Sequence, residues 1–262
     1  MAWFFSESVT LPCHTITGED ANHITASLRM KAGEQLTICD NNGIQHNCTI
    51  EHAEKGLVSV RVNESYPCMN EPQTFVTLYQ ALAKGDKMEF IIQKAVELGV
   101  KRIVPVLTDR CVSRPDEKSM KKKLERWNKI ALQAAQQSRR GEVPAVMPLQ
   151  TLSEAAKNAG KTAVVCYELG GEPLGVHIQK RTDEVSLFIG SEGGFEKYEI
   201  DEILKNGGAC ATLGNRILRA ETAPIAALSV IMYLTDNLGS VNDNKRSDNG
   251  NAINGGDWHF TP

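Results

Sequence analysis

The stretch "VSLFIGSEGGF" (185–195) decides the fold class, because it joins a short apolar run to a glycine-rich loop. Mostly apolar residues in an unbroken row are typical of a strand buried on both faces. The stretch "ACATLGNRILRAETAP" (209–224) repeats the design as a strand, a loop and the start of a helix. In open α/β sheets, ligands bind beyond the carboxyl ends of the strands, where glycines let backbone N–H groups approach them. The two loops therefore predict an α/β fold with one ligand pocket.

Strands and helices alternate on both sides of these loops. Apolar strand patterns lie at 74–82, 102–108 and 162–168, and helix patterns at 85–99, 118–139, 195–206 and 223–237. One predicted face of the first of these helices carries Met88, Ile91, Ile92, Ala95 and Val96. This alternation indicates a mostly parallel sheet with helices on both faces.

Residues 1–70 show a different pattern. Strands at 34–40, 44–53 and 56–62 follow one another, with one helical segment at 19–30. Short strands at this spacing predict a small β-barrel. The proline-containing stretch 66–73 is typical of a linker, so we expect domains at 1–70 and 73–238. We expect the Asn-, Gly- and Ser-rich segment 239–262 to be disordered.

Composition argues against several classes of protein. Apolar runs reach only about ten residues, short of the roughly 20 that cross a bilayer, and the N-terminus lacks a basic signal region, so we expect no membrane segment. Seven scattered cysteines and six dispersed histidines predict no metal site and favour a reducing, cytoplasmic location. Net charge is −3, yet residues 84–140 hold 15 Lys/Arg against 7 Asp/Glu. Such a basic band is typical of phosphate binding, although a solvated helical face has the same pattern.

Charged residues crowd the start of the last predicted helix. Thr222 can N-cap this helix, Pro224 suits its first turn, and Glu221 lies at the positive end of the helix dipole. Arg216 and Arg219 oppose that dipole and need another explanation. With the apolar residues between them, they indicate a small-molecule pocket in which an arginine holds a phosphate or stabilises developing negative charge.

The glycine-rich loop matches neither common nucleotide-binding motif. GSEGG lacks the spacing of GxGxxG, and no GK[ST] follows it. Glu192 within the loop has two interpretations: it accepts a hydrogen bond from a ligand hydroxyl, or it caps the following helix. The residues alone thus indicate a nucleotide-like pocket of unspecified chemistry.

Longer motifs resemble those of a known family, the RsmE-type SPOUT methyltransferases. The two hallmark loops of that family are similar to "FIGSEGGFEKYE" (188–199) and "LGNRILRAETAPIAAL" (213–228). Further similarity covers "NHITASLRMKAGE" (22–34), "KGDKMEFIIQKAVELGVKRIVPVLTDRCV" (84–112) and "WNKIALQAAQQSRR" (127–140). Two departures are Ser191, where the family has proline, and Trp3, where it has arginine.

The resemblance implies an N-terminal PUA-like β-barrel, a C-terminal SPOUT α/β domain with a trefoil knot, and a homodimer. It implies methylation of N3 of a uridine in 16S rRNA of the small ribosomal subunit, with S-adenosylmethionine as cofactor and no metal. The cofactor would contact residues of both loops: Gly190, Glu192, Gly193, Gly194, Leu213, Ile217, Leu218 and Arg219.

This interpretation gives roles to further residues. Arg219 would stabilise the uridine anion, Glu221 would accept a proton or fix Arg219, and Arg29 would place the RNA. His23 would contact RNA or pack within the barrel. Phosphates would lie on four arginines of the basic band: Arg110, Arg114, Arg139 and Arg140. Methylation of a ribose 2′-hydroxyl, and RNA binding without catalysis, stay open as alternatives, whereas a nucleotide sensor would leave the basic band unexplained.

Overall fold

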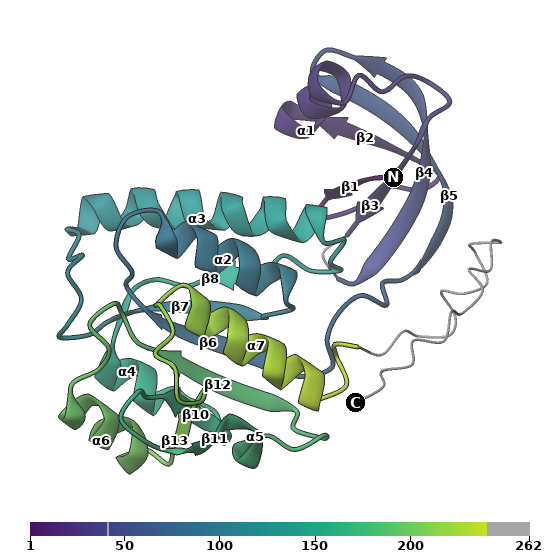
Figure 1. Ribbon diagram of the computed structural model, residues 1–262. Helices are drawn as coiled ribbons and strands as arrows, with labels where there is room; N and C mark the ends of the chain where they lie inside the picture. The colour runs from purple at the N-terminus through teal and green to yellow at the C-terminus, as the bar shows by residue number, and fades with distance from the viewer. Residues whose placement is uncertain (41, 240–262) are drawn as a thin grey trace, which may run out of the picture.

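The computed structural model describes residues 1–40 and 42–239, which form two sheets connected by residues 68–74 (Figure 1). The predicted disordered segment 239–262 lies outside the described residues except for Gly239. The N-terminal part contains β1 (Ala2–Phe5), β2 (Cys13–Thr17), α1 (Gly18–Asn22), a π-helical turn (His23–Ser27), β3 (Gln35–Cys39), β4 (Ile44–Glu54) and β5 (Leu57–Pro67).

The N-terminal sheet is curled but not closed. Its strand order is β1-β3-β4-β5-β2, and among the described residues no ladder joins β1 to β2, so the predicted barrel is a five-stranded sheet with two edges. Ala21 and Ile24, from α1 and the π-helical turn, are fully buried in its core. The helical segment ends earlier than the predicted residue 30, because Arg29 adopts a left-handed φ of 54°.

The C-terminal part is an eight-stranded sheet in which every pairing is parallel, as predicted. The strand order is β11-β13-β10-β12-β6-β7-β8, and β9 also pairs with β7. The strands are β6 (Phe75–Ala81), β7 (Arg102–Leu107), β8 (Ala145–Val146), β9 (Gln150–Thr151), β10 (Ala163–Cys166), β11 (Glu172–Pro173), β12 (Glu184–Ile189) and β13 (Ala209–Thr212).

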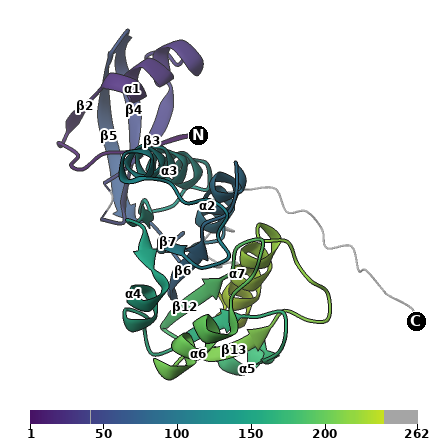
Figure 2. The same ribbon diagram turned by 90° about the vertical axis from the view of Figure 1, so that its left-hand side faces the viewer.

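Helices cover both faces of this sheet (Figure 2). They are α2 (Lys87–Glu97), α3 (Glu117–Gln137), α4 (Leu152–Lys157), α5 (Leu174–His177), α6 (Lys197–Lys205) and α7 (Thr222–Leu234). The helices α2, α3 and α7 pack on one face, and α4 and α6 pack on the other. Within the described ranges, none of the helices is long and apolar enough to cross a membrane.

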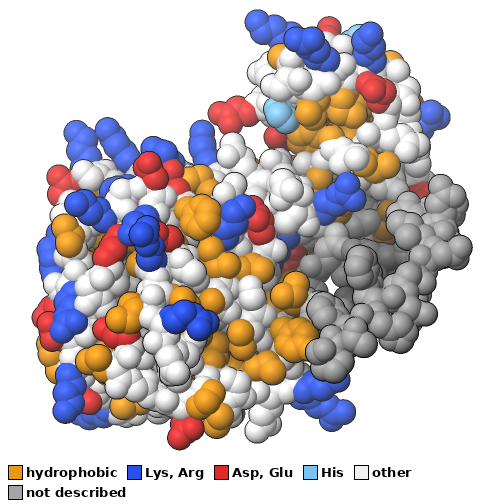
Figure 3. All heavy atoms as spheres, viewed as in Figure 1, with side chains coloured by type: hydrophobic (Ala, Val, Ile, Leu, Met, Phe, Trp, Pro, Cys, Tyr) orange, Lys and Arg blue, Asp and Glu red, His pale blue; other side chains and the backbone are white. Residues whose placement is uncertain are grey.

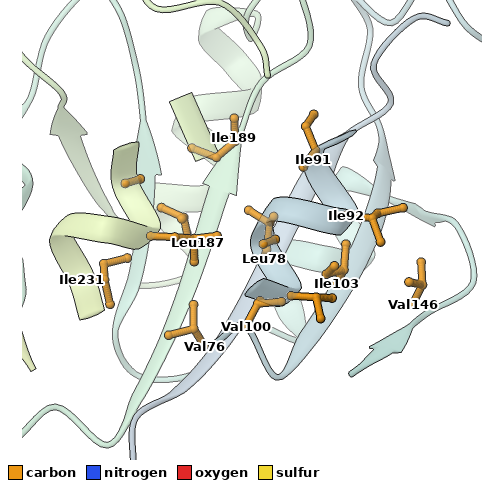
Figure 4. Close-up of a cluster of buried hydrophobic side chains, with 14 of the residues drawn as sticks. Val76, Leu78, Ile91, Ile92, Val100, Ile103, Val146, Leu187, Ile189 and Ile231 are labelled. Atoms are coloured by element: carbon orange, nitrogen blue, oxygen red, sulfur yellow. The ribbon is translucent and has the colours of Figure 1, made fainter. Parts of the chain in front are cut away.

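The larger core lies between the sheet and α2, α3 and α7 (Figure 4). All five residues predicted to line one face of α2 are at most 1% exposed, which confirms that prediction. Helix α7 is buried on only one of its faces. Ala227 and Ile231 are fully buried, whereas Val230 is 39% and Tyr233 is 67% exposed. An open apolar face therefore remains on the last helix.

Candidate functional site

A cavity of about 760 Å³ lies at the carboxyl ends of β10, β12 and β13. Parallel strands end at one edge of a sheet, so the loops that follow them meet there, as the sequence predicted. The cavity is lined by every residue predicted to contact a cofactor: Gly190, Glu192, Gly193, Gly194, Leu213, Ile217, Leu218 and Arg219. Its volume falls within the roughly 300–1,000 Å³ of small-molecule sites.

The loop between β12 and α6 needs its glycines. Gly194 has a φ of 70°, and a Cβ there would lie 2.5 Å from Oε1 of Glu168. A Cβ on Gly193 would lie 2.9 Å from the Cβ of Arg110. The Gly194 N–H donates to the Ser191 carbonyl at 3.0 Å, which closes a tight turn. Any larger residue at 194 would displace Glu168 and enter the cavity wall.

Lys87 connects the two predicted loops. Its Nζ lies 3.2 Å from Oε1 of Glu192 and 3.2 Å from Oε2 of Glu221. Burial disfavours the charge on Glu192, but hydrogen bonds from its own N–H, from the Lys84 N–H and from Lys87 outweigh burial and lower its pKa. The glutamate therefore stays ionised. It does not cap the following helix, because α6 begins at Lys197 with Glu196 in the capping position.

The start of α7 differs from the prediction. Thr222 is the first helical residue rather than the N-cap, and Glu221 occupies the N-cap position without a side-chain cap bond. The first turn is instead held by the Arg219 carbonyl, which accepts from the N–H groups of Thr222 and Ala223 at 2.9 Å each. Hydrogen bonding from its own N–H, with Lys87 and Arg219 nearby, lowers the pKa of Glu221. Its ion-pair partner is Lys87, not Arg219.

Arg216 and Arg219 line the cavity from the loop before α7, and both are exposed. Within the described part of the chain, neither takes part in an ion pair. The charges that oppose the helix dipole thus face the cavity, where a ligand can reach them.

Among the charged residues that line the cavity, sequence reasoning missed two, Lys87 and Glu168. Lys87 follows β6, and Glu168 follows β10, so their positions after apolar strands were the available signal. The Glu168 carboxylate is exposed and lies against Gly194, and among the described residues it has no ion-pair or hydrogen-bond partner within bonding distance. It is attracted at longer range by Arg110. The cavity therefore offers, on the side of the glycine loop, a carboxylate that has no ion-pair partner among the described residues.

Cys166 also lines the cavity but has no nucleophilic character. Burial, with a smaller contribution from Cys210, raises the pKa of its thiol to about 12. A thiol with such a pKa stays protonated at neutral pH, and the thiolate is the nucleophilic form. A covalent cysteine mechanism is therefore disfavoured here.

Two of the predicted phosphate-binding arginines bond within their own domain. Arg110 donates to Glu196 and to the Gly193 carbonyl at 2.8 Å each, and so braces the glycine loop. Arg114 donates to the carbonyls of Thr108 and Asp109 at 3.2 and 2.8 Å. These contacts occupy donors that phosphates would otherwise use.

Three more of the predicted RNA contacts, Arg29, Arg139 and His23, are exposed and lie in or near the N-terminal part. Arg29 and Arg139 are exposed and both have positive φ values, 54° and 56°. His23 is exposed, and its ring lies edge-on to Phe4 at a centroid distance of 6.2 Å. This geometry combines packing with access to solvent, so both predicted roles of His23 are open to it.

The prediction that Arg140 binds phosphates is wrong, because this residue is only 2% exposed. Its guanidinium donates to both oxygens of Glu71 at 3.0 and 2.6 Å, and to the carbonyls of Val96 and Val100 at 3.1 and 2.6 Å. The Trp3 indole N–H donates to the Arg140 carbonyl at 3.1 Å. Trp3, one departure from the family pattern, thus joins β1 to the C-terminal part.

Comparison with known proteins agrees with this architecture. The model of the RNA methyltransferase domain matches residues 70–232, and that of the RNA methyltransferase PUA domain matches residues 16–63. Ribosomal RNA small subunit methyltransferase E of Bacillus subtilis is 38% identical over 86% of this chain and 91% of its own length. The Mycobacterium bovis protein of the same name is 31% identical over 84% and 86%.

Solved structures show the same likeness. Ribosomal RNA small subunit methyltransferase E from Neisseria gonorrhoeae, bound to S-adenosyl methionine, has a TM-score of 0.82 and is 30% identical, over 89% of this chain and 98% of that one. A Legionella pneumophila methyltransferase with bound cofactor also has a TM-score of 0.82, at 31% identity over 88% and 96%. Two family models, long sequence similarity and a shared fold thus converge, and the chain belongs to the RNA methyltransferase family that includes ribosomal RNA small subunit methyltransferase E.

Proposed function

We propose that this protein uses S-adenosylmethionine to methylate N3 of a uridine in 16S rRNA of the small ribosomal subunit. The observation that carries the proposal is the cavity in which the two glycine-containing loops meet beside Arg216 and Arg219. Relatives named as small-subunit rRNA methyltransferases, one of them solved with S-adenosyl methionine, support the substrate and the cofactor.

The cavity suits S-adenosylmethionine in size and charge. The turn at Gly194 leaves no room for a Cβ, so the backbone itself forms the wall. Glu168, which has no ion-pair partner among the described residues, provides a carboxylate for a ligand that carries a sulfonium and an ammonium group. When bound, the cofactor supplies an activated methyl group. The eight loop residues named above would hold it.

Arg219 is proposed as the catalytic cation. Uridine N3 must lose its proton to become a good nucleophile, and a nearby guanidinium stabilises the resulting anion. Because N3 lies on the Watson–Crick edge, a paired uridine must first leave its partner, and Arg29 would help to place the RNA. Glu221 is a weak proton acceptor because its pKa is lowered, so its proposed role is to hold Lys87 between the loops.

The proposal extends to assembly and topology. A trefoil knot is supported by the strand order, since β13 enters the sheet between the earlier strands β10 and β11. A homodimer is supported by the open face of α7, where Figure 3 shows hydrophobic side chains gathered and where Val230 and Tyr233 are exposed. We also propose the division into domains at 1–70 and 73–238 and a cytoplasmic location, where ribosomal subunits assemble.

A methyl-transfer assay tests the proposal. Small subunits from cells that lack the endogenous enzyme are incubated with radiolabelled S-adenosylmethionine, and the labelled nucleoside is identified. Label in 3-methyluridine, lost in Arg219→Ala but kept in the exposed control Arg181→Ala, would support the assignment. Label on a ribose would replace it with 2′-O-methylation. Neither label nor cofactor binding would leave an RNA-binding protein without catalysis.

A further inference from the structure

The solvent face of α3 carries a row of lysines, three of which form no ion pair or side-chain hydrogen bond within the described residues. Lys118, Lys121 and Lys122 are exposed, and within the described residues none of them forms an ion pair or a side-chain hydrogen bond. Lys129, on the same helix, is 70% exposed and forms one ion pair, with the 92% exposed Glu19. By contrast, Arg110, Arg114 and Arg140 bond within the protein. Lys118, Lys121 and Lys122 are therefore cations of the basic band that are free to bind an external partner.

Helical geometry places these lysines on one stripe. At about 100° per residue, positions 118, 121, 122 and 129 fall within an arc of about 100°. Trp127, Ala131 and Ala134 are buried on the opposite side of α3. At about 1.5 Å per residue, the stripe runs for about 17 Å. One acidic residue, Glu125, lies within it, so the stripe keeps a positive charge.

The stripe lies beside the N-terminal sheet. Figures 1 and 2 both show that α3 is the helix of the C-terminal part that lies nearest the N-terminal sheet. Figure 3 shows Lys and Arg side chains that project from the surface along α3. Nζ of Lys129 lies 3.7 Å from Oε1 of Glu19 on α1. The lysines of α3 therefore lie close enough to the N-terminal sheet for one polyanion to contact both.

We propose that the lysine stripe of α3, Lys118, Lys121, Lys122 and Lys129, binds the rRNA phosphate backbone. The proposal rests on the proposed function, and it identifies a surface that binds the rRNA substrate. Flexible lysines suit phosphates as point charges, without reading base sequence. The stripe therefore contributes affinity and orientation, while the chemistry stays in the cavity.

The test compares two triple variants of the full chain. Lys118→Gln/Lys121→Gln/Lys122→Gln removes part of the stripe, and Lys157→Gln/Lys161→Gln/Lys205→Gln removes three exposed lysines from the region of α4 and α6. Binding to small ribosomal subunits is measured directly by filter binding between 50 and 300 mM salt. We expect the stripe variant to bind at least tenfold more weakly, with a log–log salt slope reduced by about 2, because each phosphate contact contributes roughly 0.7–0.9.

Further readouts separate this proposal from the proposed function. The stripe variant should raise KM for subunits and leave kcat and the affinity for S-adenosylmethionine unchanged. Unchanged binding and salt slope would overturn the stripe, as would equal losses in the control variant. Wild-type protein that binds subunits through the stripe but transfers no methyl group would overturn the proposed function alone.

Discussion

Replacing Arg140 by Met should destabilise the protein by about 3–5 kcal/mol, because the change leaves a buried carboxylate without its main partner. The Arg140 side chain is 3% exposed and that of Glu71 is 14% exposed. Glu71 would keep only Lys101, whose Nζ lies 3.3 Å away, and backbone N–H groups such as that of Gly141. The Val100 carbonyl would also lose the guanidinium donor, and the Val96 carbonyl would keep only the N–H of Gly99.

The predicted loss of stability arises because Glu71 is left without Arg140, not because one charge is removed. In the double variant Glu71→Gln/Arg140→Met no charge is left without a partner, so its loss of stability should fall below the sum of the two single losses by about 2 kcal/mol or more.

Low pH should also destabilise the protein through Glu71. Burial raises the pKa of Glu71, but hydrogen bonds and attraction from Arg140 and Lys101 outweigh it, and the folded-state pKa is lowered. Its stabilising contribution is present above the unfolded pKa of about 4.3 and is lost as pH falls through the folded pKa.

Urea unfolding followed by circular dichroism at pH 7 measures these free energies. Arg126→Met is a matched control, since Arg126 also lies 2.6 Å from a carboxylate, that of Glu89, but its side chain is 65% exposed. Exposed pairs contribute about 0–1 kcal/mol, so this variant should lose little. A cost below about 1 kcal/mol for Arg140→Met, or single costs that simply add in the double variant, would refute the reasoning.

Three further predictions concern the cavity. Gly194→Ala should weaken S-adenosylmethionine binding at least tenfold in calorimetry without unfolding the protein, because its Cβ collides with Glu168 and its φ is positive; unchanged affinity would count against the turn as the cofactor wall. Lys87→Met should move the acid limb of the pH–rate profile to higher pH, since Lys87 helps to hold the pKa values of Glu192 and Glu221 low; an unmoved limb would exclude both carboxylates from it. Cys166 should resist iodoacetamide at pH 8, because burial raises the pKa of its thiol to about 12; mass spectrometry showing rapid alkylation would contradict this.

Local sequence patterns were sufficient to predict those features that depend on the residues of a single segment. The apolar run at 185–189, the periodicity of α2 and the glycines of the following loop predicted a parallel sheet with a pocket at its carboxyl edge. Such features depend on side chains a few positions apart, so neighbouring residues already contain the information. The predictions of where the first helical segment ends, near Arg29, and where α7 begins were less accurate. Both positions depend on single backbone conformations and on hydrogen bonds in turns.

The sequence by itself therefore determined the fold class, the two loops and the family. Only the tertiary structure decided which charges are available for function. Arg139 and Arg140 are neighbours and look alike in the sequence, yet the first is exposed and the second is buried on Glu71, 69 positions away. Lys87 meets Glu192 because the strand order brings the end of β6 beside the end of β12, and it meets Glu221 because α7 packs beside α2. Ion pairs between distant segments follow from packing, which local sequence patterns do not contain.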